Sequence, residues 1–443
     1  MVGVMKIVLI NNLYEPYARG GAEQVVKTIA DGLVEAGHKG VVVSTRPVVK
    51  SIKLTPSHDS GSKVHKVESQ ELATTSNDSN ITSYSLLVTR YFFSPWNIIS
   101  YYNLHKLPAA LRLVWHLIDM FNPQSYFKIK KILKREQPDL VMTHNLTGVG
   151  FLTPLAIKHC GIRHIHTLHD IQLLHPSGLM LVGKEKKVDG LLVRVYQWCN
   201  KKLFRSVDMV ISPSQWLLDE HAQRGFFRKA KKMVMANPMS VKNSVGAYPS
   251  LSEEEEGGGG EQINHACLRS SLVKRGIGLT NFIFLYVGQL AKHKGVELLV
   301  EAFMELNNDK CELWIAGDGD YKILNIKYQT SNKIKLLGGK SHDEIKIIMS
   351  KAHCLVVPSL CYENQPTVIR EAKQNNLPVI ASNIGGIPEI LNHEFLFKAG
   401  DKESLKNKMQ WFMDNYDEVQ KTQKVETYIF TSAQDYVDKI LQS

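Results

Sequence analysis

Residues 358–371 read Pro-Ser-Leu-Cys-Tyr-Glu-Asn-Gln-Pro-Thr-Val-Ile-Arg-Glu, which places Glu363 and Glu371 within one short segment. The residues just before it, 354–357, read Cys-Leu-Val-Val and are typical of a buried strand. A Leu-Pro-Val-Ile-Ala-Ser run follows at 377–382 and is typical of a second buried strand. The pattern predicts a strand, a loop that carries Glu363, a helix that carries Glu371, and a further strand.

Two residue types that favour helix starts lie between the glutamates. Asn364 can cap the helix with its side chain, and Pro366 suits the first turn. A carboxylate in the loop can accept hydrogen bonds from ligand hydroxyls, while the helix N-terminus offers N–H groups to an anion. A sugar nucleotide presents sugar hydroxyls, a diphosphate and a ribose diol in that order. A solvated helix face is the alternative interpretation of the two glutamates.

Two upstream segments repeat the pattern of a strand followed by a glycine turn. The first, 282–302, reads Phe-Ile-Phe-Leu-Tyr-Val-Gly-Gln-Leu-Ala-Lys-His-Lys-Gly-Val-Glu-Leu-Leu-Val-Glu-Ala and predicts a strand, a turn with Lys294 and an amphipathic helix. The second, 313–320, reads Leu-Trp-Ile-Ala-Gly-Asp-Gly-Asp. A Gly-Gly-Ile-Pro-Glu segment lies at 385–389, after the last of these strands.

Together these segments resemble the retaining GT-B glycosyltransferases of family 4. The resemblance extends from Met5 to about Ile390, with a gap between Pro47 and Leu104. It implies an α/β chain with the GT-B fold, in which two Rossmann-like domains with parallel sheets face each other across a central cleft. Strand–helix alternation along the whole chain independently favours parallel sheets covered by helices.

A chain of 443 residues exceeds one typical domain, so two domains are expected. We predict an N-terminal acceptor-binding domain over 1–237 and a C-terminal donor-binding domain over 238–425. The last helix, about 426–443, is expected to pack back onto the first domain. The run Glu-Glu-Glu-Glu-Gly-Gly-Gly-Gly within 250–264 cannot build a core and predicts a disordered insertion. A polar stretch, 47–80, predicts an excursion loop.

The resemblance also implies a reaction and a site. The reaction is transfer of a hexosyl unit from a UDP- or GDP-linked sugar to the hydroxyl of a sugar or lipid-linked acceptor, with retained configuration, in surface polysaccharide or glycolipid assembly. No metal and no other cofactor is expected. The residues expected to act in catalysis are His169, Lys294 and Glu363. Those expected to bind the donor are Gly20, Gly21, Gly288, Gln289, Lys294, Gly317, Glu363, Asn364, Gln365, Pro366, Thr367 and Glu371.

In the first domain the predicted site lies after two strands. Gly20 and Gly21 follow the first strand, where backbone N–H groups of a glycine pair can approach a phosphate. His169 follows a strand at 165–168 and is placed by the resemblance near the donor sugar. A metal site is the alternative for the histidines, because His164, His166, His169 and Asp170 have ligand chemistry.

Gln289 departs from the family pattern, which carries arginine directly after the strand glycine. Glutamine can donate a hydrogen bond to a phosphate but supplies no charge. The alternative function is therefore a catalytically weak or inactive GT-B protein that binds nucleotide sugar as a partner subunit. A Rossmann oxidoreductase is disfavoured, because the Gly-Asp-Gly turn lacks the full Gly-x-Gly-x-x-Gly fingerprint.

The net charge of the chain is +11, and basic residues gather in two segments where aromatic and apolar residues lie between them. Such a face could dock on anionic lipid headgroups, attract an anionic acceptor or be a solvated surface. No nucleic-acid-binding motif accompanies it. The segment 86–121 is broken by charges and prolines, so no membrane span is predicted. Six cysteines without a Cys-x-x-Cys pair and no signal-peptide pattern predict a cytoplasmic protein.

The two basic segments are defined by their lysines and arginines. The first contains Lys184, Lys186, Lys187, Arg194, Lys201, Lys202 and Arg205, and the second contains Arg224, Arg228, Lys229, Lys231 and Lys232. The interleaved residues are Tyr196, Trp198, Leu203, Phe204, Phe226 and Phe227.

Overall fold

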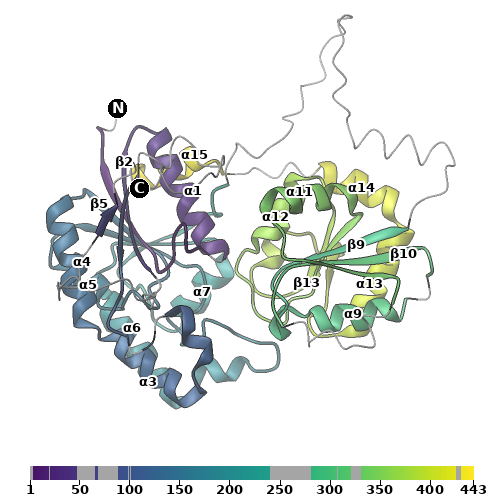
Figure 1. Cartoon of the computed structure of the whole chain (residues 1–443), viewed down its shortest axis with the longest axis horizontal. Helices are drawn as coiled ribbons and strands as arrows, with labels where there is room; N and C mark the ends of the chain where they lie inside the picture. Colours follow the sequence, from purple (N-terminus) through teal and green to yellow (C-terminus); the bar gives the residue numbers. More distant parts are fainter. Residues whose placement is uncertain are drawn as a thin grey trace, which may run out of the picture. The chain divides into compact units, whose positions relative to one another are not determined.

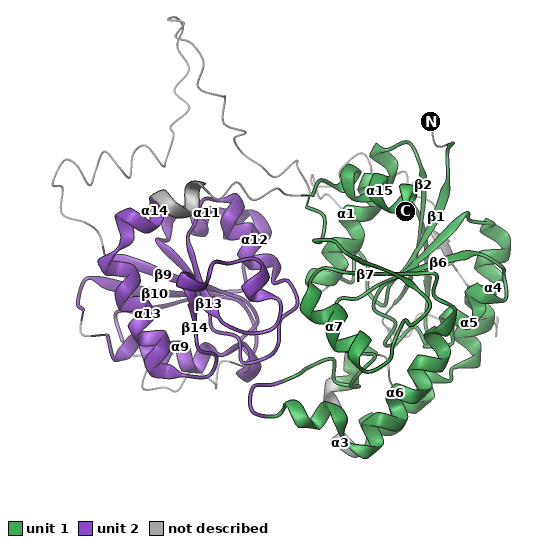
Figure 2. Ribbon diagram, turned by 180° about the vertical axis from the view of Figure 1, so that it is seen from behind, with its two compact units in different colours: residues 1–180, 184–241, 430–443 green, residues 181–183, 242–429 purple. Residues whose placement is uncertain are grey.

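The structure is a computed structural model of the whole chain. It describes residues 3–18, 20–46, 65–67, 88–97, 99, 101–239, 281–306, 308–320, 331–425 and 431–443. The chain forms two compact units (Figure 2). Unit 1 comprises Met1–Met180, Lys184–Val241 and Phe430–Ser443, and unit 2 comprises Leu181–Gly183 and Lys242–Ile429.

Unit 1 is built on a sheet with the strand order β3-β4-β2-β1-β5-β6-β7-β8. All neighbouring strands are parallel except β3 and β4, which are antiparallel. The order places the first strand at the centre, where both faces are buried, as its apolar run requires. The strands are β1 (Lys6–Ile10), β2 (Lys39–Thr45), β3 (His65–Val67), β4 (Thr89–Phe93), β5 (Leu140–Thr143), β6 (Arg163–Thr167), β7 (Met209–Ser212) and β8 (Lys231–Val234).

Helices cover both faces of this sheet. On one face, α1 and α15 share a hydrophobic cluster with Ile7 and Leu9 of β1. A Cβ at Gly32 of α1 would lie 2.7 Å from Cβ of Ala433, so a glycine permits this close packing. Figure 2 shows α4, α5 and α6 on the other side. The helices are α1 (Gly21–Glu35), α3 (Ala109–Met120), α4 (Pro123–Glu136), α5 (Thr153–Lys158), α6 (Leu191–Leu203), α7 (Gln215–Gln223) and α15 (Ala433–Gln442), with 3₁₀ turns η2 (Tyr101–Lys106), η3 (Glu185–Asp189) and η4 (Phe204–Ser206).

Unit 2 is built on an entirely parallel sheet with the order β11-β10-β9-β12-β13-β14 (Figure 1). Its strands are β9 (Phe282–Val287), β10 (Cys311–Ala316), β11 (Ile334–Gly338), β12 (Cys354–Val357), β13 (Val379–Ser382) and β14 (Leu396–Phe397). Its helices are α9 (Val296–Met304), α11 (His342–Lys351), α12 (Thr367–Gln374), α13 (Lys402–Asp414) and α14 (Tyr416–Val425), with 3₁₀ turns η6 (Lys292–Lys294), η8 (Ile387–Glu389) and η9 (His393–Phe395).

Two hydrophobic clusters lie on opposite faces of this second sheet. One joins α9 and α13 to alternate strand residues such as Phe284 and Val356. The other joins α11 and α12 to the intervening residues, such as Leu285 and Leu355. The near-continuous apolar runs predicted as buried strands are therefore covered on both sides, as a parallel sheet requires.

The structure corrects one detail of the predicted helix start. The helix α12 begins at Thr367 with Pro366 at the N-cap position, and no side chain caps it. Asn364 therefore belongs to the preceding loop and does not cap the helix. The predicted insertion at 250–264 lies outside the described residues, as does the excursion at 47–80 apart from β3.

The structure also corrects the predicted lipid-facing role of the aromatic residues in the basic segments. Tyr196, Phe204, Phe226 and Phe227 are buried in unit 1, whereas Trp198 is exposed. Four of these aromatic side chains therefore build the core, because burial of large rings is a main source of stability. Among the described residues, no helix has the length and apolar character needed to cross a membrane.

Candidate active site

The carboxyl ends of four parallel strands in unit 2 bring together the residues predicted from sequence. Gly288 follows β9, Gly317 follows β10, Pro358 follows β12, and Asn383 follows β13. Because parallel strands end at the same edge of a sheet, the loops after them form one cluster. Backbone hydrogen bonds join these loops, for example from the N–H of Gly288 to the carbonyl of Ala316 at 3.0 Å.

The turn that carries Lys294 is locked against the loop after β12. Gly295 has a φ of 73°, and a Cβ there would lie 1.8 Å from the Pro358 carbonyl oxygen. Only glycine satisfies both the left-handed backbone and this close approach. The His293 carbonyl accepts hydrogen bonds from the N–H groups of Leu360 and Cys361, at 2.9 and 3.1 Å. The lysine turn and the Glu363 loop are thus held in a fixed register.

The central feature of the site is an ion pair between Lys294 and Glu363. Lys294 Nζ lies 2.6 Å from Glu363 Oε1, and the Ser359 hydroxyl donates to the same oxygen at 3.0 Å. Burial alone would lower the pKa of Lys294, but the Glu363 carboxylate outweighs it and raises the pKa overall. The lysine is therefore a cation at neutral pH, within a few ångströms of a carboxylate.

A glycine pair after β13 supports the Glu363 backbone from the other side. The N–H of Gly386 donates to the Glu363 carbonyl at 2.8 Å. Gly385 has a φ of 60°, and a Cβ there would lie 2.2 Å from the same carbonyl oxygen. The Gly-Gly segment singled out from sequence is thus part of the same loop cluster as Lys294 and Glu363.

The second glutamate lies within α12 and is partly buried. Burial raises the pKa of Glu371, while the positive charges of His342, Arg370 and Lys346 act against this shift. Arg370 is itself buried, and its Nη1 donates to Gln365 Oε1 at 3.4 Å. Asn364 and Gln365 lie in the loop between the two glutamates, Pro366 is the N-cap of α12, and Thr367 is its first residue.

Gln289 occupies the position directly after the strand glycine. Its side chain is exposed, and its backbone carbonyl accepts a hydrogen bond from the Tyr286 hydroxyl at 2.8 Å. The turn after β10 lies beside it, because Leu290 forms a β-bridge with Gly319. Gln289 and Gly317 therefore belong to adjacent loops at the same sheet edge.

In unit 1, Gly20 and Gly21 lie where the predicted glycine loop enters a helix. Gly20 is the N-cap of α1, and Gly21 is its first residue. A Cβ at Gly20 would lie 3.1 Å from Glu23 Oε2, so the Glu23 side chain folds back over the helix start. This carboxylate occupies space next to the N–H groups that the sequence analysis assigned to a phosphate.

His169 lies in a buried polar network after β6. Its Nε2 shares a hydrogen bond with His144 Nδ1 at 2.9 Å, and burial lowers the pKa of His169 to about 4. The adjacent Asp170 accepts a hydrogen bond from the Gln172 N–H at 2.7 Å. Burial raises the pKa of Asp170 to about 6. At neutral pH, His169 is therefore uncharged.

The histidines considered for a metal site have other partners. His164 Nε2 and His166 Nδ1 are both hydrogen-bonded to the Thr143 hydroxyl, at 2.7 and 2.8 Å. His169 is bonded to His144 instead. Within the parts of the chain that the structure describes, no group of three or more His, Cys, Asp or Glu side chains could hold a metal ion.

Family models match both parts of the chain. The model described as Glycosyltransferase Family 4 matches residues 19–241, which is half of the chain, and that described as Glycosyl transferases group 1 matches residues 271–428. The chain belongs to glycosyltransferase family 4. The structure of this family 4 chain is α/β with two sheets of mainly parallel strands, which is the GT-B fold predicted from sequence.

Relatives and solved structures agree with this assignment. The chain is 26% identical over 388 residues to an uncharacterised 42.6 kDa protein in the cps region of Klebsiella pneumoniae, covering 87% of each. It resembles the sucrose-phosphate synthase of Thermosynechococcus elongatus with a TM-score of 0.66 and 16% identity, covering 99% of this chain and 98% of that one. It also resembles Anabaena HepE, solved in complex with UDP, with a TM-score of 0.63 and 16% identity, covering 99% and 100%.

The family 4 chain also contains site residues that sequence reasoning missed. Ser359 and Cys361 both contact Glu363 Oε1 and orient it. His144 is the partner of His169, and buried Asp119 accepts hydrogen bonds from Gly148 N–H and Asn97 Nδ2, both at 2.8 Å. Asp119 is the acidic residue of the mainly apolar helix α3, and this is a signal that could have been followed.

Proposed function

We propose that this family 4 chain transfers a hexosyl unit from a nucleoside diphosphate sugar to a hydroxyl acceptor with retained configuration. The observation that carries the proposal is the contact between Lys294 and Glu363 at the carboxyl edge of the unit 2 sheet. A cation suited to a diphosphate and a carboxylate suited to sugar hydroxyls lie within one hydrogen bond of each other. A sugar phosphate carries both an anionic group and hydroxyls, so each of the two side chains has a matching group on such a ligand.

The proposed step separates charge at the bond between the anomeric carbon and the diphosphate. As that bond breaks, its electron pair goes to the diphosphate oxygen, and Lys294 stabilises the developing charge. The acceptor oxygen bonds to the anomeric carbon on the same face, and its proton goes to the departing phosphate. Glu363 holds sugar hydroxyls and fixes the ring, so catalysis rests on position and electrostatics.

The remaining predicted residues receive supporting roles in this proposal. Glu371 binds the ribose diol, and the first turn of α12 offers N–H groups to the diphosphate. Neutral His169 hydrogen-bonds a sugar hydroxyl without adding charge. The ligands bound in similar structures support a UDP-linked donor, because HepE was solved with UDP and with UDP-glucose. The cps-region relative supports a surface polysaccharide as the product class.

A thermal-shift titration with UDP, GDP, ADP and NAD tests the donor site. A nucleotide at a hundred times its dissociation constant adds about 2.7 kcal/mol of stability. We expect a shift with a uracil or guanine nucleotide that is lost in Glu371→Ala and kept in Glu403→Ala, which removes an exposed carboxylate from α13 of the same unit. No shift with any nucleotide contradicts the donor site.

A second function is favoured by the exposed, uncharged Gln289. In that case the chain binds nucleotide sugar as a partner subunit without turnover. Both functions predict the nucleotide shift, so the test that separates them is transfer. Release of UDP from UDP-hexose, measured with a panel of sugar and lipid-linked acceptors, supports the transferase. Binding of UDP-hexose without release of UDP, with every acceptor tested, supports the partner subunit.

A further inference from the structure

The helix α6 of unit 1 has its polarity reversed relative to an ordinary surface helix. Its buried residues are Tyr196, Gln197 and Asn200. Four large apolar side chains point outward, with exposed fractions between 55% and 81%: Leu191, Leu192, Val195 and Trp198. A surface helix normally turns its apolar stripe inward. Here the large apolar side chains face outward.

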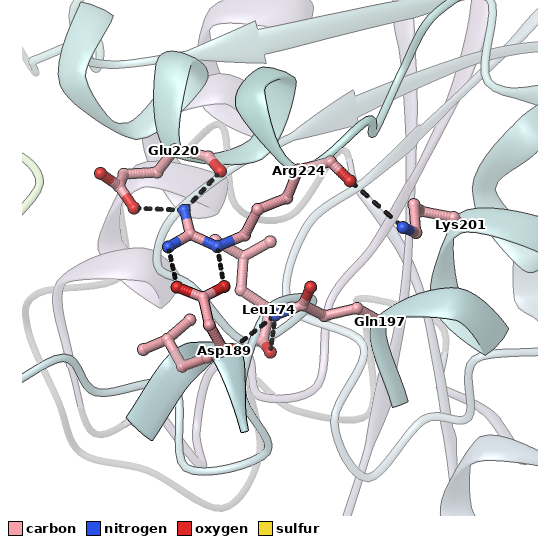
Figure 3. A network of polar contacts seen from close by, with 7 residues as sticks. Leu174, Asp189, Gln197, Lys201, Glu220 and Arg224 are labelled. Carbon is pink, nitrogen blue, oxygen red and sulfur yellow. Dashed lines mark hydrogen bonds and ion pairs between the residues drawn. The ribbon is translucent and has the colours of Figure 1, made fainter. Parts of the chain in front are cut away.

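Polar side chains, rather than apolar packing alone, anchor α6 to the unit. Gln197 Nε2 donates to the carbonyls of Leu174 and Val188, at 3.1 and 2.7 Å (Figure 3). Asn200 Nδ2 donates to the Leu173 carbonyl at 2.9 Å, and the Tyr196 hydroxyl to the Gln172 carbonyl at 2.7 Å. These bonds fix which side of α6 faces outward.

A second network holds the turn that precedes α6. Arg224 forms a two-pronged ion pair with Asp189, both N–O distances being 2.9 Å, and contacts Glu220 Oε2 at 2.6 Å (Figure 3). Lys201 of α6 donates to the Arg224 carbonyl at 3.2 Å. The outward side of α6 is therefore presented on a rigid support, and the Arg224 charge is used internally.

The neighbouring helix α3 shows the same reversal. Trp115 is buried and its Nε1 donates to the Ile99 carbonyl at 2.6 Å, and Asp119 is buried beside it. The exposed apolar residues are Leu111, Leu113, Val114 and Leu117 of α3, and Phe121 at its end. The loop 148–151 contacts the inner sides of both helices: the Gly148 N–H donates to Asp119 of α3 at 2.8 Å, and the centre of the Phe151 ring lies 6.4 Å from that of Tyr196 of α6. Both helices lie together on one side of unit 1 in Figures 1 and 2.

We call this surface the α3–α6 face, defined by the nine exposed apolar residues just named. Isolated exposed apolar side chains are ordinary, but a cluster on two adjacent helices marks an interaction site. Exposed basic residues lie on the same helices and on the turns before and after α6. They are Arg112, Lys184, Lys186, Lys187, Arg194, Lys202 and Arg205.

We propose that the α3–α6 face docks on an anionic lipid bilayer. Apolar side chains enter the headgroup region, and the lysines and arginines just named contact anionic headgroups. Lys202 Nζ lies 5.7 Å from the centre of the Trp198 ring, so a tryptophan and a basic group stand together as they do at membrane interfaces. Charge favours a lipid over a second copy of the chain, because two basic faces repel each other. The proposal does not depend on transfer activity.

Sedimentation of the full chain with vesicles tests the proposal. We expect binding to vesicles of phosphatidylcholine with about one-third phosphatidylglycerol, and at least about tenfold weaker binding to phosphatidylcholine alone. Leu191→Ser with Val195→Ser and Trp198→Ser should weaken binding to the anionic vesicles by about tenfold or more. Arg194→Glu with Lys202→Glu should do the same and reduce the sensitivity of binding to salt.

Matched controls lie on α11 of unit 2, where Ile347 is 56% exposed and Lys351 is also exposed. Ile347→Ser and Lys351→Glu should leave vesicle binding within about twofold. The proposal is overturned if the parental chain does not bind anionic vesicles, or if the α6 and α11 variants behave alike. It is also overturned if light scattering shows a dimer that only the α6 variants dissociate, which makes the face a contact between copies. Nucleotide shifts of the α6 variants should equal those of the parent, so failure here and failure of the donor site are separate results.

Discussion

The two units place different chemistry at the carboxyl ends of their parallel strands. In unit 2, Lys294 and Glu363 carry opposite charges in direct contact, with side chains 30% and 17% exposed. In unit 1, burial lowers the pKa of His169 to about 4 and raises the pKa of Asp119 to about 7. Burial disfavours the charged form of each of these unit 1 groups. Unit 2 thus carries a charged pair at this edge, whereas burial favours the uncharged forms of His169 and Asp119 in unit 1.

The difference matches the two ligands of the proposed reaction. A diphosphate is an anion and is bound best by a fixed cation, whereas a hydroxyl is neutral and needs only hydrogen bonds. A buried neutral network can select a hydroxyl by its hydrogen bonds, because a wrong group leaves buried polar atoms without partners. Each of the following experiments tests one side of this contrast.

Removal of the Lys294 charge should have the largest effect on sugar transfer. Lys294→Ala should reduce sugar transfer by about 10²–10³-fold, as expected for loss of a group that stabilises developing charge. The matched control is Lys292→Ala, an exposed lysine in the same turn, which should change transfer by less than about threefold. Steady-state kinetics with the preferred donor measures both. Equal losses in the two variants would mean that the turn, rather than the Lys294 charge, is what matters.

The backbone that positions the ion pair should be nearly as sensitive. Gly295→Ala places a Cβ 1.8 Å from the Pro358 carbonyl oxygen at a φ of 73°. The left-handed backbone alone costs an L-residue about 1–2 kcal/mol, and the clash adds to it, so we expect a loss above about 2 kcal/mol. Gly37→Ala is the control, because Gly37 has a φ of 79° and no heavy atom within 4 Å of a Cβ. Urea unfolding, followed in each unit by hydrogen exchange, separates the clash from the backbone cost.

The buried, uncharged histidines of unit 1 predict that stability depends on pH. Burial lowers the pKa of His164 to about 3, so the folded chain leaves it uncharged while the unfolded chain protonates it near pH 6.5. Its contribution to stability is present above pH 6.5 and is lost as pH falls toward 3, by about 1.4 kcal/mol per pH unit. His164→Gln removes this pH dependence of the free energy of unfolding. The stability difference between variant and parent, from hydrogen exchange of β5 and β6 peptides, should therefore shrink between pH 7 and pH 5. A constant difference would show that His164 is not neutral in the folded chain.

The smallest effect concerns the missing cation at position 289. Gln289→Arg adds a charge to an exposed position beside the lysine turn and should raise transfer by up to about tenfold, or 1.4 kcal/mol of barrier. The control is Lys292→Gln, which removes an exposed charge from the same turn instead of adding one and should not raise transfer. Kinetics at saturating donor measures the change. No gain from the arginine would indicate that Lys294 alone supplies enough charge for the leaving group.

Much of the fold was predictable from local pattern. The apolar runs predicted as strands at 354–357 and 377–382 contain β12 and β13, and the strand predicted within 282–302 is β9, because a strand buried on both faces has a continuous apolar sequence. The N-terminus of α12 was less predictable. Asn364 has the right chemistry for an N-cap, but the loop continues to Pro366, since its backbone is held by the contact of Gly386 with Glu363.

The α3–α6 face shows the limit of sequence reasoning most clearly. Aromatic residues near lysines suggested a lipid-facing surface, yet Phe226 and Phe227 are core residues, whereas Leu113 and Leu117 are exposed. Periodicity identifies the apolar side of a helix but not the direction in which that side points. In α6 the direction is set by Gln197 and Asn200, which donate to the carbonyls of Leu174 and Leu173, 23 and 27 residues away in the chain.

The sequence alone determined which residues belong to the loops at the carboxyl edge of the unit 2 sheet, because strand runs, glycine turns and the two glutamates are local patterns with local physical causes. Tertiary structure decided what those residues touch. Lys294 and Glu363 meet only because parallel strands far apart in sequence end at one sheet edge and because Gly295 permits the close approach. Contacts of that kind depend on long-range packing, which fixes both the charge of a buried group and the side of a helix that meets solvent.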